Sequence, residues 1–154
     1  MIWLFWSSVA LIAYTYFGYP AWLLVRRKWK SAPVHRAPVL PSISLVMVVR
    51  NEAEVLQRKL RNLLSLNYPA ELCEIVIVSD GSSDGTEQLL REYASNRIRA
   101  VFLSKACGKA AGLNEAIKVV SNDIVVFTDA RQEIEAGALQ LLMENFFNPA
   151  CLLK

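Results

Sequence analysis

The chain has 154 residues, enough for one modest domain, and 54% of them are hydrophobic, more than in a typical soluble domain. Its formal net charge of +3 is unevenly distributed, because residues 1–42 hold five Lys and Arg residues and no acid. The remaining twelve basic and fourteen acidic residues give residues 43–154 a formal charge of −2, which argues against nucleic acid as a partner.

The first 25 residues predict a single transmembrane helix. Residues 2–25 carry no charged side chain, and this run is longer than the roughly 20 residues that a helix needs to cross a bilayer. A cleaved secretory signal is the alternative, but no basic segment precedes the run, which also exceeds the core of about 7 to 15 residues that signals have. The basic cluster at 26–30 follows directly, so the positive-inside rule predicts an inner (plasma) membrane protein with a cytoplasmic body.

Residues 26–42 predict a basic, proline-containing linker, and the pattern changes after it. From residue 43 to 154, apolar runs alternate with helical stripes at short loop spacing. Strands are expected at 43–49, 74–79, 98–104 and 123–128. Helices are expected at 54–66, at 108–120 and at 136–147. A further helix is expected to begin at a capping box formed by Asp84 and Glu87. Continuous rather than alternating apolar strands are typical of a sheet covered on both faces, so the fold class is α/β with a parallel sheet.

Rare residue types exclude several kinds of chemistry. Cys73, Cys107 and Cys151 are widely spaced, odd in number and without a CxxC pair, so they predict neither a disulfide framework nor a zinc site. His35 is the only histidine, which rules out a histidine metal cluster and a Ser-His-acid triad. Any chemistry is therefore expected to proceed without imidazole.

Polar residues follow every predicted strand, where open α/β sheets bind their ligands. They are Arg50, Asn51 and Glu52 after the first strand, Asp80 and the turn 81–85 after the second, Lys105 and 107–109 after the third, and Asp129 after the fourth. Turn and capping preferences explain any one of them alone. Together they supply acceptors, lysines and glycines to one crevice, which suits a ligand with phosphate, hydroxyl and metal parts.

The sign of the charge on each of these side chains indicates which part of a ligand it is expected to bind. A carboxylate at Asp80 would repel phosphate, so Asp80 is expected to accept hydrogen bonds from a base N–H or a ribose hydroxyl. Asp129 could bind a divalent cation together with substrate phosphates, and Lys105 and Lys109 would be point charges for a diphosphate. A dinucleotide fold and a P-loop are disfavoured, because no GxGxxG follows the first strand and Ala110 stands where a P-loop has Ser or Thr. A phosphorelay receiver would not explain the Ser-rich turn.

Four motifs carry a resemblance to a known family. They are VVRNEAE at 48–54, VSDGSSDGT at 78–86, GKAAGLN at 108–114 and FTDA at 127–130. In this order and spacing, residues 41–149 resemble family-2 glycosyltransferases, in the membrane-bound branch related to chitin, hyaluronan and poly-N-acetylglucosamine synthases. The resemblance implies a GT-A fold that binds a UDP-sugar and serves a polysaccharide or lipid-linked acceptor.

The resemblance also implies residue roles. Asn51, Glu52, Asp80, Lys109 and Asp129 would bind the nucleotide sugar, with Glu52 and Asp80 near the uridine and Lys109 near the diphosphate or the sugar. Asp129 would be the first acid of the family's DxD motif and would bind Mg²⁺ or Mn²⁺.

Two departures from the family pattern matter. Arg131 replaces the second acid of DxD, which leaves two possibilities open: Asp129 binds the cation with help from Glu133 or phosphate, or Arg131 partly replaces the charge of the ion. The family's catalytic carboxylate and its QxxRW-like motif find no match, so no catalytic residue is assigned, and residues 43–154 are expected to be a donor-binding half that is inactive alone. The alternative is a non-catalytic nucleotide-binding or membrane-tethered interaction module.

Overall fold

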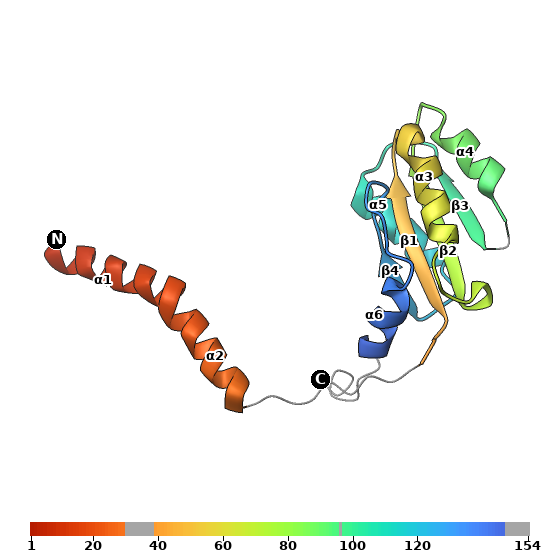
Figure 1. Ribbon diagram of the computed structural model, residues 1–154. Coiled ribbons are helices and arrows are strands. Elements are labelled where there is room, and N and C mark those ends of the chain that lie inside the picture. Colours follow the sequence, from red (N-terminus) through yellow and green to blue (C-terminus); the bar gives the residue numbers. More distant parts are fainter. Residues whose placement is uncertain (30–38, 96, 147–154) are drawn as a thin grey trace. The chain divides into compact units, whose positions relative to one another are not determined.

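The computed structural model describes residues 1–29, 39–95 and 97–146, which belong to two separate units (Figure 1). The described part of the first unit, residues 1–29, is helical. It consists of α1 (Ile2–Ala13), a π-helical turn (Tyr14–Gly18) and α2 (Tyr19–Trp29). A candidate membrane span covers Ile2–Lys28, with 27 residues and a mean hydropathy of 1.3, so by length and composition this helix could cross a bilayer.

The helix ends four residues later than the sequence predicts. Arg26, Arg27 and Lys28, expected to open the linker, form the last turn of α2 instead, where cations interact favourably with the helix dipole. Residues 30–38 of the expected linker lie outside the described residues, as do His35 and Cys151.

Polar side chains within the apolar helix are satisfied by its own backbone. The Ser7 and Ser8 hydroxyls donate to the Leu4 carbonyl oxygen at 2.9 and 2.8 Å, and the Thr15 hydroxyl donates to the Leu11 carbonyl oxygen at 2.8 Å. A hydrocarbon environment provides no other partner for these groups, so the three residues are compatible with a membrane span.

The second unit, within residues 36–154, alternates between strand and helix as predicted. Its strands are β1 (Ile43–Val49), β2 (Cys73–Asp80), β3 (Ile98–Leu103) and β4 (Ile124–Phe127). Its helices are α3 (Ala53–Leu64), α4 (Thr86–Tyr93), α5 (Lys109–Val119) and α6 (Ala138–Phe146), with a short 3₁₀ turn at Ala70–Leu72.

All four strands are parallel, in the order β3-β2-β1-β4. The central strands β1 and β2 are buried along almost their whole length, as their Ile and Val runs predict. The outer strands β3 and β4 are only half-buried, and Phe127 at the end of β4 is 56% exposed. The predicted parallel α/β sheet is therefore present.

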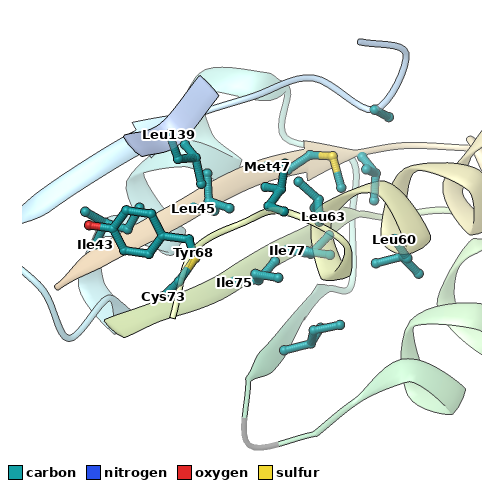
Figure 2. Packing of buried hydrophobic residues seen from close by; sticks show 14 of the residues in the cluster. Ile43, Leu45, Met47, Leu60, Leu63, Tyr68, Cys73, Ile75, Ile77 and Leu139 are labelled. Atoms are coloured by element: carbon teal, nitrogen blue, oxygen red, sulfur yellow. The ribbon is translucent and has the colours of Figure 1, made fainter. Parts of the chain in front are cut away.

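Helices cover both faces of the sheet (Figure 1). On one face, side chains of α3, α4 and α6 pack on the strands in a cluster that includes Leu45, Met47, Leu60, Leu63, Ile75, Ile77 and Leu139 (Figure 2). On the other face, Ala116 of α5 packs against Val46, Val76 and Val78. This layering leaves the carboxyl ends of the strands uncovered by helices, which is where a site can form.

Helix α5 approaches the sheet through Gly112, and this contact gives a first prediction. A Cβ atom at Gly112 would lie 2.7 Å from Val48 Cγ1. Gly112→Ala is expected to lower the free energy of unfolding by about 1 to 2 kcal/mol, because overpacking outweighs the gain in helix propensity. Urea denaturation of the full chain in detergent measures the change.

Gly137→Ala is the matched control, since no described heavy atom lies within 4 Å of its new Cβ. Its effect should stay within about 0.5 kcal/mol. Equal effects of the two substitutions would show that α5 and β1 are not in close contact.

Candidate functional site

A pocket lies at the carboxyl ends of the strands. It has a volume of about 300 Å³ and is lined by Val48, Val49, Arg50, Glu52, Asp80, Gly108, Lys109, Asp129 and Ala130. Since β1 has β2 on one side and β4 on the other, the pocket is at the point where the chain reverses its direction across the sheet, the usual ligand position in such folds. Four of the five predicted site residues, namely Glu52, Asp80, Lys109 and Asp129, therefore converge on one pocket. Their roles in binding stay predictions.

Asn51 is the predicted residue that does not line this pocket. Its Oδ1 accepts a hydrogen bond from Ser83 N at 2.8 Å, and its own N donates to Ser82 Oγ at 3.2 Å. With φ of 52°, it occupies the left-handed region that Asn tolerates better than most residues. Asn51 thus joins the turn after β1 to the turn after β2 and positions its neighbour Glu52.

Asp84 strengthens the same junction and corrects the predicted capping box. Its two carboxylate oxygens accept from Thr86 N at 2.9 Å and Ala53 N at 3.1 Å, so that it satisfies the first turns of both α4 and α3. Hydrogen bonds from Thr86 lower the pKa of Asp84. The carboxylate of Glu87 accepts from Ser79 Oγ at 3.4 Å, so the reciprocal bond of a capping box is replaced by a contact with β2.

Asp80 is 3% exposed, and its carboxylate is held by the backbone of the loop before α5. Its Oδ1 accepts from Cys107 N at 2.7 Å, and its Oδ2 accepts from Gly108 N at 2.9 Å. Gly81 has φ of +60°, and a Cβ there would lie 2.6 Å from Ala106 N, so glycine is required for this close approach. Asp80, which is expected to accept hydrogen bonds from a ligand, therefore also fixes the shape of the pocket. Each oxygen of its carboxylate retains lone pairs for a ligand.

Lys109 and Asp129 are paired across the pocket. Lys109 Nζ lies 2.8 Å from Asp129 Oδ2, and both side chains are about half-exposed. The hydrogen bond from Lys109 lowers the pKa of Asp129. Asp129, which is expected to hold a cation, is thus bound by Lys109, which is expected to hold the diphosphate.

Arg131 forms a second pair, with Glu52. Arg131 Nε and Nη2 each lie 3.1 Å from Glu52 Oε1, and this pairing raises the pKa of Arg131. The Arg131 side chain is 74% exposed and that of Glu52 is 19% exposed. The pair was not predicted from the sequence, although an arginine at the position of a DxD acid was the signal that could have indicated it.

Lys59 is a residue that the sequence analysis missed. It lies in α3, is 1% exposed, and donates from Nζ to Thr128 Oγ1 at 2.9 Å and to the Gln132 carbonyl oxygen at 2.5 Å. Burial lowers the pKa of Lys59. The signal was its spacing of three from Leu56, which places it on the buried stripe of the helix. Lys59 in α3 therefore supports the loop that carries Asp129 and Arg131.

Asn62, one turn further along α3, holds the same loop. Its amide donates to the Ile134 carbonyl oxygen at 2.8 Å and accepts from Ile134 N at 2.9 Å. Lys59 and Asn62 therefore both hold the loop after β4, so the position of this loop is set by α3.

The side chains of the described residues do not fit a preformed divalent-cation site. Among residues 1–29, 39–95 and 97–146, no group of three or more His, Cys, Asp or Glu residues gathers that could hold a metal. Asp129 is bound by Lys109, and an arginine occupies the second DxD position. Mg²⁺ at a phosphate ligand usually uses one or two carboxylates together with the phosphates. Asp129 would be the one such carboxylate here, and it already has a partner in Lys109.

Comparison with known proteins gives consistent matches. The family model described as "Glycosyl transferase family 2" matches residues 44–152. A poly-beta-1,6-N-acetyl-D-glucosamine synthase of Staphylococcus epidermidis is 39% identical over 105 residues, which cover 68% of this chain and 25% of that protein. A synthase of the same name from Staphylococcus aureus (strain COL) is 34% identical over 123 residues, covering 79% and 29%. The chain spans well under half the length of these relatives.

Solved structures share the fold. The mannosyltransferase PcManGT from Pyrobaculum calidifontis, in complex with GDP-Man and Mn²⁺, matches with a TM-score of 0.76 and 29% identity, covering 92% of this chain and 43% of that one. S. aureus TarS 1-349 in complex with UDP-GlcNAc matches with a TM-score of 0.60 and 24% identity, covering 66% and 30%. These matches confirm the predicted GT-A type of sheet. Because the family model matches more than half of the chain, and a relative is 39% identical over 68% of it, the chain belongs to glycosyl transferase family 2.

Proposed function

We propose that residues 43–146 form the donor site of a glycosyltransferase that uses a UDP-sugar. The observation that carries this proposal is the convergence of Glu52, Asp80, Lys109 and Asp129 on one pocket at the carboxyl edge of the sheet. The names of the relatives support a nucleotide-sugar donor, since TarS is described in complex with UDP-GlcNAc and the curated relatives are poly-N-acetylglucosamine synthases.

The geometry suggests a role for each residue. Glu52 and Asp80 would supply acceptors for base N–H groups and ribose hydroxyls, and Lys109 would supply a point charge for the diphosphate. Asn51 acts through Glu52, because its hydrogen bonds hold the turn in which Glu52 lies. We assign no catalytic residue to this stretch, and we propose a polysaccharide or lipid-linked acceptor.

We also propose that the apolar helix anchors the enzyme in the inner membrane, with the α/β unit in the cytoplasm. The candidate span Ile2–Lys28 supports the anchor. The basic residues Arg26, Arg27 and Lys28 lie at its carboxyl end, next to the α/β unit in sequence, as the positive-inside rule requires for this orientation. Sugar nucleotides are made in the cytosol, so this orientation gives the pocket access to its donor.

The test is a calorimetric titration of the full chain in detergent with UDP. We expect saturable binding that Lys109→Met weakens by at least about tenfold, a loss of about 1.4 kcal/mol, because the diphosphate loses its nearest cation. Lys118→Met is the matched control: it lies on the same helix, also forms an ion pair, with Glu115 at 2.7 Å, and does not line the pocket. An absence of UDP binding would favour the interaction module, and equal effects of both variants would refute the role of Lys109.

A further inference from the structure

The charges around the pocket balance without a metal ion. Three carboxylates belong to it, those of Glu52, Asp80 and Asp129, and each has a partner in the described protein. Arg131 binds Glu52, two backbone N–H groups bind Asp80, and Lys109 binds Asp129. Arg50 also lines the pocket. Arg131 lines the adjoining cavity, and Glu52 lines both that cavity and the pocket. With Arg50, Lys109 and Arg131 counted against the three acids, the formal charge is zero.

Arg131 decides this balance. An aspartate at position 131 would complete the DxD pattern and would change the local formal charge by −2, which is the charge that one divalent cation compensates. With arginine there, the charge that a cation would bring is already supplied by a side chain. A planar guanidinium also suits phosphate, because it can bind two oxygens at once.

A divalent cation at Asp129 would meet two obstacles. It would share the Asp129 carboxylate with the Lys109 ammonium, which lies 2.8 Å from Oδ2, and it would lie close to Arg131, whose pKa is raised by Glu52 and also by Asp129. Like charges repel at this range, and water screens part of the repulsion because the Lys109 and Arg131 side chains are 60% and 74% exposed. The exposed Arg131 side chain, by contrast, is accessible to an anionic ligand.

We propose that Arg131 takes the place of the divalent cation in this chain, so that Lys109 and Arg131 bind the donor diphosphate and binding needs no metal. This inference rests on the proposed donor site. The sequence leaves two possibilities open, a cation bound at Asp129 or partial replacement of its charge by Arg131. The inference selects the second. Arg131 remains bound to Glu52 through one edge of its guanidinium and offers its other N–H groups to a phosphate oxygen.

The experiment compares UDP titrations of the full chain in detergent, in EDTA and in MnCl₂. For the unmodified chain, the two dissociation constants should agree within about twofold. For Arg131→Asp, binding in EDTA should weaken by at least about tenfold and should recover in MnCl₂, because the restored DxD acids can hold the ion. Titration with MnCl₂ alone gives a second readout, with binding expected for Arg131→Asp and none for the unmodified chain.

Arg58→Asp is the matched control. Arg58 is also an exposed arginine in an ion pair, with Glu133 at 3.2 Å, but its partner does not line the pocket, whereas Glu52, the partner of Arg131, does. It should acquire no manganese dependence. The inference is overturned if EDTA abolishes UDP binding to the unmodified chain and MnCl₂ restores it, or if Arg131→Asp binds UDP in EDTA as well as the unmodified chain does. If neither protein binds UDP under any condition, the donor site itself is refuted.

Discussion

Asp80→Asn is expected to lower the free energy of unfolding by about 2 to 4 kcal/mol and to abolish measurable UDP binding. The Asp80 carboxylate is almost completely buried and accepts from two backbone N–H groups, of Cys107 and Gly108. An amide has one acceptor oxygen, so one of these N–H groups would face an NH₂ group and lose its partner. Hydrogen bonds to a charged group contribute about 1.5 to 3 kcal/mol, and a buried unsatisfied donor costs about 1 to 3 kcal/mol.

Two measurements separate the local effect from the global one. Urea denaturation of the full chain in detergent gives the stability change, and hydrogen exchange read by mass spectrometry gives the protection of the loop that contains Cys107 and Gly108. Protection there should fall more than protection in β1, because the substitution releases the loop before it releases the sheet. Unchanged protection of the loop would contradict the assignment.

Asp84→Asn is the control for Asp80→Asn. Asp84 also accepts from two backbone N–H groups, but it is exposed and water can replace its partners. We expect a loss of about 1 kcal/mol or less for Asp84→Asn, the range of an exposed cap. Equal effects at the two positions would mean that burial of Asp80 has no energetic consequence.

The sequence predicted the sheet well, because the signal for a covered parallel strand is local. Continuous Ile and Val runs at 43–49 and 74–79 require burial on both faces, and the observed β1 and β2 have it. The convergence of Glu52, Asp80 and Asp129 was also predictable, since the carboxyl ends of parallel strands meet at one edge.

The partners of these side chains could not be predicted in the same way. Asp80 binds backbone N–H groups 27 and 28 residues further along the chain, and Arg131 reaches back 79 residues to Glu52. Such pairs depend on where loops come to lie, and loop positions follow from packing rather than from local pattern. The same reason explains Asn51, whose side chain was assigned to the ligand but binds Ser83 of the neighbouring turn.

Lys59→Met is expected to weaken UDP binding by at least about tenfold while lowering the free energy of unfolding by only about 1 to 2 kcal/mol. Thr128 Oγ1 and the Gln132 carbonyl oxygen would lose their donor, which removes the support of the loop that carries Asp129 and Arg131. The loss of these bonds is partly offset, because a buried ammonium is itself unfavourable. Asn62 still holds Ile134, so the loop should loosen without unfolding the domain.

The pH dependence of stability identifies Lys59 as a buried cation rather than a packing residue. Its pKa in the folded chain lies below its ordinary value of 10.5, because burial outweighs the attraction of Asp129 and Glu133. Below the folded pKa, Lys59 is charged in both states and the full burial penalty applies. As the pH rises from the folded pKa towards 10.5, only the folded state has lost the proton, so the penalty is relieved. The stability of the unmodified chain should therefore rise relative to Lys59→Met across this alkaline window.

Urea denaturation at a series of pH values gives the difference between the two proteins. Taking this difference removes the opposite effect of Cys73, whose pKa is raised by burial in both. The exposed Lys118→Met, compared in the same way, is the control for the loss of a lysine side chain at the surface. A flat difference for Lys59→Met would mean that Lys59 keeps its ordinary pKa and that its ammonium is solvated. In that case Lys59 would not hold the loop of Asp129 as a buried cation, and Asn62 would be the remaining polar contact from α3 to this loop.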